Sequence, residues 1–261
     1  MPVFTDQLGN EINLPQAPER IVSLVPSQTE LLFNLGLESE VVGITKFCIH
    51  PHQWFTTKTR VGGTKNLNIE LIHQLNPDLL VANKEENIKE QVELLSAFYP
   101  VWVSDVNKLA DALEMIQIVG DITGTSIKAM RLISEINNEF NKIVPRRPSL
   151  TAAYLIWKDP YMVAGGNTFI NSMLQTAGFK NAFENLPRYP QVSVSDIKNT
   201  GCDYILLSSE PYPFKQKHLQ HLQAEIPDAK IILVDGEMFS WYGSRLLKAP
   251  AYFKKLWQQM L

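Results

Sequence analysis

The chain has 261 residues, a formal net charge of −3 and 45% apolar residues. This charge gives no general attraction to nucleic acid, so no nucleic-acid partner is expected. No apolar run approaches the about 18 to 20 residues that cross a bilayer, so no transmembrane segment is expected. The sequence before Arg20 lacks a signal-peptide pattern, and nothing in the spacing of Cys48 and Cys202 brings them into a disulfide.

The stretch RIVSLVPSQTELLFNLG, residues 20–36, predicts a strand, a turn and a helix. The apolar run Ile21 to Val25 stops at Pro26. Ser27 then has the position of an N-cap, with Glu30 three residues later as in a capping box. The N-terminus of this helix would point beyond the carboxyl end of the strand, where open α/β sheets bind ligands. The candidate ligand-binding residues here are Pro26, Ser27 and Gln28.

The rest of the first half alternates helices and strands. An extended pair with a turn at Gly9 and Asn10 comes first, and a long irregular loop is expected from Thr45 to Asn66. Short connections elsewhere favour a parallel sheet flanked by helices, which makes one Rossmann-like lobe. The predicted strands are 41–44, 79–82 and 101–104, and the predicted helices are 68–75, 85–98 and 108–122.

A long helix follows this lobe. From Ser126 to Ile143 apolar residues recur every three or four positions, and Pro145 and Pro148 then end the pattern. This helix is expected to connect two lobes. In the second half the predicted strands are 150–157, 204–207 and 230–234, and the predicted helices are 167–177, 193–199, 214–224 and 244–260.

The second half weakly repeats the first. The segment from Ile69 matches the segment from Val194, which sets Asp78 opposite Asp203. Two similar lobes imply a cleft between them. We therefore expect an α/β fold with two Rossmann-like lobes, each with a parallel sheet, joined by one backbone helix, with the ligand cleft between the lobes. The predicted boundaries are 1–124 for the first lobe, 125–145 for the helix and 146–261 for the second lobe.

The motifs of phosphate-binding enzymes and hydrolases are absent, because the sequence has neither GxxxxGK[ST] nor GxSxG. Cys48, His50 and His52 alternate along one segment, so an extended conformation would point three good metal ligands to one side. A metal site needs about four ligands, and the other interpretation is a polar loop shaped by Pro51. His218, with His221, is expected at the surface.

Aromatic residues gather in the loops that follow the predicted strands. Some of these rings are expected to cap the core, and the others suit a flat or macrocyclic ligand, with cationic side chains as counter-charges. The aromatic candidates for ligand binding are Phe47, Trp54, Trp157, Tyr161, Tyr189, Tyr212, Trp241 and Tyr242. The cationic candidates are Lys65, Lys84, Arg188 and Arg245.

Three segments carry a resemblance to a known family: RIVSLVPSQTELLFNLG with VVGIT after it, LNIELIHQLNPDLLVANK, and PQVSVSDIKNTGCDYILLS. In their order and spacing the chain resembles the ABC-transporter substrate-binding proteins with a helical backbone, which take up vitamin B12, haem and ferric siderophores. The resemblance covers nearly the whole chain. It implies two lobes joined by a rigid helix and a ligand held in a shallow cleft without chemistry.

The resemblance also implies docking to a permease through one acidic residue on each lobe. In the first lobe this position falls on Glu70. In the second it falls on Ser195, so Asp196 or Glu184 would have to take its place. In the cobalamin binders of this family a tryptophan is expected just before the NLN segment, and this chain has Thr64 there. The aromatic residue expected before PQVS is retained as Tyr189.

The resemblance implies a binding protein, not an enzyme, whose ligand is a metal chelate such as cobalamin, haem or a ferric siderophore. No intrinsic cofactor is expected, and the protein is expected to be a monomer. The partner would be an ABC permease in the periplasm or cell envelope. Two alternatives stay open: a chelatase-like or metal-handling enzyme that uses Cys48, His50 and His52, and a cytoplasmic ligand sensor.

Overall fold

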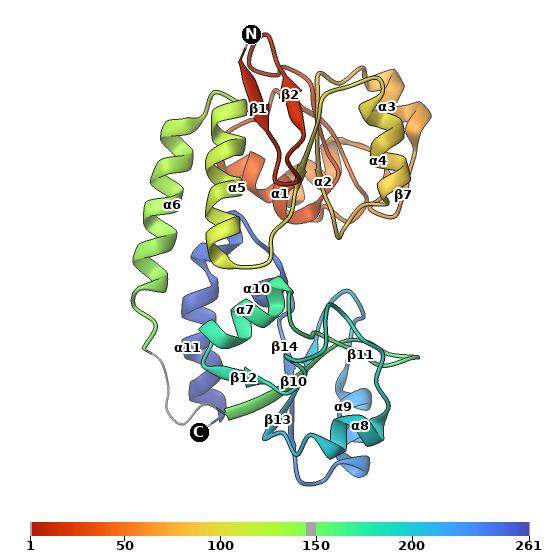
Figure 1. Cartoon of the computed structure of the whole chain (residues 1–261), viewed down its shortest axis with the longest axis vertical. Helices are drawn as coiled ribbons and strands as arrows, with labels where there is room; N and C mark the ends of the chain where they lie inside the picture. Colours follow the sequence, from red (N-terminus) through yellow and green to blue (C-terminus); the bar gives the residue numbers. More distant parts are fainter. Residues whose placement is uncertain (1, 145–149, 261) are drawn as a thin grey trace. The chain divides into compact units, whose positions relative to one another are not determined.

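The computed structural model describes residues 2–144 and 150–260. The chain forms two compact units, each built around its own sheet (Figure 1). The first unit comprises Met1–Val106, Ala110–Asn137 and Tyr242–Arg245. The second unit comprises Asn107–Leu109, Asn138–Trp241 and Leu246–Leu261. The predicted stop of the long helix at Pro145 and Pro148 lies outside the described residues.

The sheet of the first unit has the order β5-β4-β3-β8-β9, and every neighbouring pair is parallel. Its strands are short apolar runs because both faces of a parallel sheet are buried. The predictions for 41–44 and 101–104 are confirmed, and the strand predicted at 79–82 is one residue longer. The strands are β3 (Ile21–Ser23), β4 (Val41–Ile44), β5 (Thr59–Arg60), β8 (Leu79–Asn83) and β9 (Val101–Ser104).

Two antiparallel hairpins and six helices complete this part of the chain. The first hairpin confirms the predicted turn at Gly9 and Asn10, whereas the predicted irregular loop after Thr45 contains a helix and three short strands. The hairpins are β1 (Val3–Thr5) with β2 (Glu11–Asn13), and β6 (Gly62–Gly63) with β7 (Asn66–Leu67). The helices are α1 (Pro26–Asn34), α2 (His52–Thr57), α3 (Ile69–Leu75), α4 (Lys89–Ser96), α5 (Leu109–Ile122) and α6 (Ser126–Phe140).

Two helix starts differ from the prediction for local reasons. The N-cap of α1 is Val25, and Pro26 occupies the first helical turn, so the predicted cap at Ser27 is wrong. Proline suits this position because its missing N–H and fixed φ cost nothing there. Helix α4 starts four residues later than predicted, because the Oδ1 atom of Asn83 accepts hydrogen bonds from the backbone N–H groups of Glu85 and Glu86 and holds them in a turn.

The sheet of the second unit has the order β11-β10-β13-β14, with β12 also paired to β10. Strands β10, β12, β13 and β14 are parallel to their neighbours, and β11 is antiparallel to β10. The predictions for 150–157 and 230–234 are confirmed. The strands are β10 (Leu150–Trp157), β11 (Met162–Val163), β12 (Phe179–Asn181), β13 (Tyr204–Ser208) and β14 (Lys230–Val234).

The single helix predicted over 244–260 is divided into a 3-10 turn and a helix. Proline is tolerated only in the first turn of a helix, so Pro250 forces a new start at Ala249. The other helices of this half follow the prediction, with α10 added. The elements are α7 (Phe169–Thr176), α8 (Val194–Asn199), α9 (Gln216–Glu225), α10 (Glu237–Ser240), η1 (Ser244–Leu247) and α11 (Ala249–Met260). Within residues 2–144 and 150–260, no helix has the length and apolar content to cross a membrane.

The predicted match between Asp78 and Asp203 is confirmed by their geometry. The carboxylate of Asp78 accepts hydrogen bonds from the backbone N–H groups of Glu19 and Arg20, at 2.7 and 2.8 Å, where β3 begins. The carboxylate of Asp203 accepts from the backbone N–H and the hydroxyl of Thr151 in β10, both at 2.7 Å. Each aspartate precedes a central strand and holds the start of the neighbouring strand. The hydrogen bonds from Thr151 lower the pKa of the Asp203 carboxyl.

We expect Asp203→Ala to lower the free energy of unfolding by about 1 kcal/mol at pH 7, because it removes charge-assisted hydrogen bonds at an exposed site. A carboxyl whose pKa is lowered in the folded state stabilises above its unfolded pKa of about 3.9, and this contribution is lost as the pH falls further. The difference between variant and wild type in urea unfolding should therefore shrink at pH 3. The exposed Asp228→Ala is the control, and an equal loss at both pH values would contradict this account.

Candidate functional site

The loops after β3, β8 and β9 meet at the carboxyl edge of the first sheet, because parallel strands end on the same side. Buried amide side chains tie these loops together. The Nδ2 atom of Asn83 donates to the backbone carbonyl and the Oγ atom of Ser104, at 3.1 and 2.9 Å. The Nε2 atom of Gln28 donates to the same Oγ atom at 2.5 Å. Gln28 was predicted to contact a ligand, but its side chain is fully buried and positions Ser104 instead.

A second buried amide holds the loop after β8. The Nδ2 atom of Asn87 donates to the backbone carbonyls of Leu24 and Thr64, at 3.2 and 3.1 Å. The Oδ1 atom of Asn87 accepts from the backbone N–H of Asn83 at 2.9 Å. The loop is therefore attached to the segment after β3 and to the β6-β7 hairpin. The edge of the sheet is rigid before any ligand arrives.

Two carboxyl groups, a lysine and a phenol lie at this edge. Glu86 is half-buried, and desolvation raises the pKa of its carboxyl, while the charge of Lys65 lowers this pKa and that of Glu85 raises it. The Nζ atom of Lys65 donates to the backbone carbonyl of Glu85 at 2.5 Å. The phenol of Tyr242 is buried among these groups, and burial followed by the charge of Glu86 raises its pKa well above the ordinary value. Lys65 and Tyr242 were predicted here, and the two glutamates were not.

The predicted metal ligands do not form a cluster. The Sγ atom of Cys48 lies 3.1 Å from the hydroxyls of both Thr29 and Thr45 in the core. His52 is exposed at the start of α2, and the segment between Cys48 and His52 is not a strand, so the expected one-sided array is wrong. In residues 2–144 and 150–260, no group of three or more His, Cys, Asp and Glu residues is arranged to hold a metal ion. His50 is half-buried, and both Cys48 and Cys202 are free.

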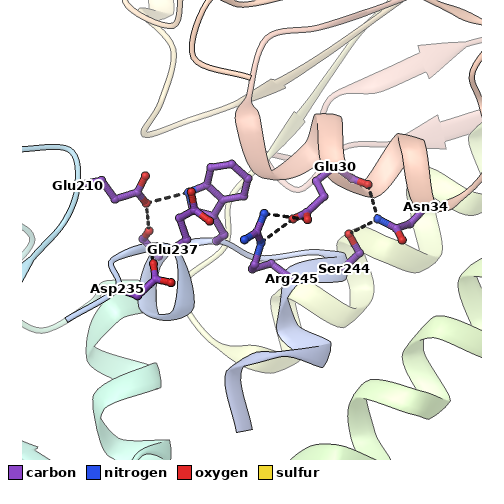
Figure 2. A network of polar contacts seen from close by, with 9 residues as sticks. Glu30, Asn34, Glu210, Asp235, Glu237, Ser244 and Arg245 are labelled. Atoms are coloured by element: carbon purple, nitrogen blue, oxygen red, sulfur yellow. Dashed lines mark hydrogen bonds and ion pairs between the residues drawn. The ribbon is translucent and has the colours of Figure 1, made fainter. Parts of the chain in front are cut away.

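Arg245 has an internal partner. Its Nε and Nη2 atoms donate to the two carboxylate oxygens of Glu30, each at 2.8 Å, and both side chains are buried. Figure 2 shows this pair beside the hydrogen bonds of Asn34 to Ser244 and to the backbone of Glu30. The predicted role of Arg245 as a counter-charge for a ligand is contradicted. The predicted capping role of Glu30 is contradicted for the same reason.

The segment that carries Arg245 fits closely on α1. Gly243 has a φ of 101°, and a Cβ at this position would lie 3.3 Å from the backbone oxygen of Ser27. A residue with a side chain would therefore be strained both in its backbone and in its packing. This segment, Tyr242–Arg245, belongs to the first unit although it is more than 100 residues distant in sequence from its other parts. Sequence patterns give no signal for such a long-range assignment.

An aromatic cluster lies at the carboxyl edge of the second sheet. Trp157 ends β10 and remains 40% exposed, and its ring lies 5.7 Å from that of Tyr212. Tyr212 also contacts Phe214 and His218, at 4.8 and 5.4 Å between ring centroids. Tyr161 is half-buried, packs on the same core as Tyr212 and has the Nζ atom of Lys158 over its ring. The structure thus brings Trp157, Tyr161 and Tyr212 into one region, and their contact with a ligand stays a prediction.

His218 belongs to this aromatic cluster, so its predicted surface position is wrong. Its side chain is buried, and burial together with nearby lysines lowers its pKa. The Nδ1 atom accepts a hydrogen bond from the backbone N–H of Lys215 at 2.9 Å. The proton of the neutral ring is therefore on Nε2, which faces the hydroxyl of Tyr212 at 3.4 Å. The buried ring of His218 therefore helps to hold Tyr212 in position.

Several predicted ligand contacts lie elsewhere. Trp54 is fully buried against Phe33, with ring centroids 5.3 Å apart, which contradicts its predicted contact with a ligand. Trp241 is buried, and its Nε1 atom donates to the Oε1 atom of Glu210 at 2.8 Å. Ser27 is also buried. Outside the aromatic cluster, the predicted ligand-binding residues that are exposed or half-buried are Pro26, Phe47, Lys65, Lys84, Arg188 and Tyr189.

The two residues predicted to dock a permease are both exposed. Glu70 lies in the first turn of α3. The Oδ2 atom of Asp196 accepts from the backbone N–H and the hydroxyl of Ser193, at 2.8 and 2.7 Å, in a capping box at the start of α8. These bonds lower the pKa of the Asp196 carboxyl. Asp196 therefore has a structural role of its own, and docking stays a prediction for both residues.

A cavity of about 650 Å³ lies within the second unit. It opens between the loop after α6 and the helix α11, and its wall includes Phe253, Trp257 and Lys254. None of the predicted ligand-binding residues lines it. The aromatic cluster and the buried polar network mark the sheet edges as the better candidates, because they combine exposed rings with ordered polar groups.

A family model for periplasmic binding proteins matches residues 21–228. The chain belongs to the periplasmic binding protein family. The vitamin B12-binding protein of Photorhabdus laumondii is 25% identical over 254 residues, which cover 95% of this chain and 90% of the relative. The uncharacterized ABC transporter substrate-binding lipoprotein YvrC of Bacillus subtilis is 26% identical over 218 residues, which cover 78% of this chain and 68% of YvrC.

Solved structures of this family share the fold. The periplasmic heme-binding protein RhuT from Roseiflexus sp. RS-1 superposes with a TM-score of 0.77 at 23% identity, over 91% of this chain and 98% of RhuT. The vitamin B12 binding protein BtuF of Vibrio cholerae superposes with a TM-score of 0.73 at 19% identity, over 94% of this chain and all of BtuF. The predicted family and the predicted α/β fold with two Rossmann-like lobes are thereby confirmed.

We expect Arg245→Met to lower the free energy of unfolding by about 3–5 kcal/mol, because it leaves the Glu30 carboxylate buried without its partner. The double variant Glu30→Met/Arg245→Met should recover most of this loss. Urea unfolding measures both. Lys84→Met removes the more exposed ion pair with Asp105 and should cost only about 0–1 kcal/mol. A loss for Arg245→Met as small as that of Lys84→Met would contradict the assignment.

Burial raises the pKa of the Cys48 thiol to about 11. About one thiol in a thousand would then be ionised at pH 8, against about one in four for an unfolded cysteine. In a Cys202→Ser background, iodoacetamide should therefore alkylate Cys48 at least about a hundredfold more slowly in the folded chain than in urea. Mass spectrometry follows the reaction, and similar rates in both states would show that the thiol is neither buried nor protonated.

Proposed function

We propose that this chain is the solute-binding component of an ABC importer and that its solute is a metal chelate. One observation supports this class of ligand above all: the exposed ring of Trp157 lies against Tyr212 at the carboxyl edge of the second sheet. Such rings suit the flat face of a macrocycle. The vitamin B12-binding and haem-binding relatives support the same class of ligand.

Among corrinoids, haem and ferric siderophores, the charges at the first sheet edge favour a corrinoid. Lys84 pairs with Asp105 at 2.5 Å, and Arg245 is paired with Glu30 inside the protein. Lys65 donates to the backbone carbonyl of Glu85, and its charge lowers the pKa of the Glu86 carboxyl. Two of these three cations are thus paired with carboxylates. The carboxylates of a haem would gain little from such cations, whereas the neutral amides of a corrinoid need only hydrogen-bonding groups.

Binding without chemistry is part of this proposal. The family is one of binding proteins, and the alternative of a metal-handling enzyme depended on Cys48, His50 and His52. Those side chains are not arranged as a metal cluster in the described residues. A substrate-binding lipoprotein and several proteins described as periplasmic are among the relatives, which supports a place in the cell envelope and a permease partner. We further propose that the protein acts as a monomer.

Titration of the purified chain with cyanocobalamin, haemin and a ferric siderophore, read by tryptophan fluorescence, tests this function. We expect cyanocobalamin to bind at micromolar concentration or below, and Trp157→Ala to weaken it about tenfold through loss of a stacking contact. Leu233→Ala is the matched control, because Leu233 is also 40% exposed in the second unit.

The alternatives give different results in the same titration. Tighter binding of haemin than of cyanocobalamin would contradict the preference for a corrinoid. Failure of all three chelates to bind would contradict the proposed function. An equal effect of Leu233→Ala and Trp157→Ala would remove the aromatic cluster from the site.

A further inference from the structure

The backbone of Tyr212 is held in place at the carboxyl edge of the second sheet. Tyr212 lies in the loop after β13, with Pro211 before it and Pro213 after it. Its backbone N–H donates to the carbonyl of Ile156 near the end of β10 at 3.3 Å, and its carbonyl accepts from the N–H of Phe214 at 2.9 Å. The two prolines restrict the backbone further. The ring of Tyr212 therefore starts from a defined position on the sheet.

The ring of His218 packs against this tyrosine and has a defined tautomer. Its centroid lies 5.4 Å from that of Tyr212 and 5.7 Å from that of Phe214. His218 is the third residue of α9, and its Nδ1 atom accepts from the backbone N–H of the N-cap residue Lys215 at 2.9 Å. A glutamate or glutamine has this role in a capping box. Since Nδ1 accepts, the proton of the neutral ring is on Nε2.

The surroundings of His218 favour the neutral ring. Burial is the largest cause that lowers the pKa of its imidazole, the charges of Lys217, Lys158 and Lys215 lower this pKa further, and the charge of Asp159 raises it. The positive end of the α9 dipole also disfavours an imidazolium in the first turn. A second ring proton would point at the backbone N–H of Lys215. The ring is therefore a neutral donor through Nε2.

The Nε2–H group of His218 decides how the hydroxyl of Tyr212 can bond. The Nε2 atom lies 3.4 Å from this hydroxyl. Because Nε2 has the proton, the hydroxyl oxygen is the acceptor, and the phenol keeps its own proton for another acceptor. Within residues 2–144 and 150–260, no protein group accepts a hydrogen bond from the Tyr212 hydroxyl. The half-buried Tyr212 thus offers one unused O–H donor beside the exposed ring of Trp157.

We propose that Tyr212 determines specificity at the chelate site by donating a hydrogen bond to a carbonyl oxygen of the ligand, and that His218 is the positioning residue that orients its hydroxyl. This inference rests on the proposed function and extends it to one chemical group of the ligand. A macrocycle is wider than the 5.7 Å between the ring centroids of Trp157 and Tyr212, so a ligand packed on Trp157 would also reach Tyr212. The amide side chains of a corrinoid provide carbonyl oxygens at its rim.

Nitrogen-15 NMR of the ligand-free chain tests the tautomer directly. The ring nitrogens of His218 are assigned by the loss of their signals in His218→Gln. At about pH 8 we expect a neutral ring with its proton on Nε2. A proton on Nδ1 would overturn the proposal, because Nε2 would then accept from the Tyr212 hydroxyl and leave no proton for a ligand.

Titration of the full chain with cyanocobalamin tests the contact with the ligand. We expect Tyr212→Phe to weaken binding about three- to tenfold, because it removes one hydrogen bond and keeps the ring. His218→Leu should weaken binding about threefold, and His218→Gln, which keeps an N–H donor near the position of Nε2, should restore most of the affinity. Tyr204→Phe and His221→Leu are the matched controls, because Tyr204 lies at the opposite end of β13 and His221 is exposed on α9.

A double-mutant cycle separates orientation of the hydroxyl from packing. If His218 acts through the Tyr212 hydroxyl, His218→Leu should cost no further affinity in a Tyr212→Phe background. Additive losses would overturn the role of His218. Wild-type affinity in Tyr212→Phe would overturn the whole inference and leave the proposed function intact, and this variant decides even if His218→Leu does not fold. Failure of the wild-type chain to bind any chelate would contradict the proposed function and this inference with it.

Discussion

Parallel pairing of the strands is the constraint on which both candidate edges depend. In the first sheet it brings the ends of β3, β8 and β9 together, and in the second it does the same for β10, β13 and β14. Asp78 and Asp203 hold the opposite ends of the strands in the two units by equivalent hydrogen bonds. The loops at the carboxyl edges therefore extend from a frame whose register is determined by hydrogen bonds at the other ends of the strands.

The first edge is rigid because its polar groups bind one another. Asn83, Asn87 and Gln28 use their amides to connect loops, and Glu30 holds Arg245 and thus the segment around Gly243 on α1. Arg245 is thereby paired inside the protein and is not available to a ligand. This supports the proposal of a ligand that is recognised by shape, aromatic contact and neutral hydrogen bonds.

Local patterns were sufficient to predict most strands, since buried parallel strands are short apolar runs between turn residues. They failed where a distant residue decides the outcome. Glu30 has the spacing of a capping box, yet its carboxylate pairs with Arg245, 215 positions along the chain. The same applies to Trp54, which looks like a loop residue in the sequence and is a core residue on a short helix.

Hydrogen–deuterium exchange with and without cyanocobalamin tests the central claim most directly, namely that loops at the carboxyl ends of the strands bind a metal chelate. The account predicts that added cyanocobalamin slows exchange in the loops after the strands, above all in residues 83–87 and 157–161. Protection confined to the helix α11 and the loop after α6, which line the separate cavity, would contradict it, as would unchanged exchange at both edges.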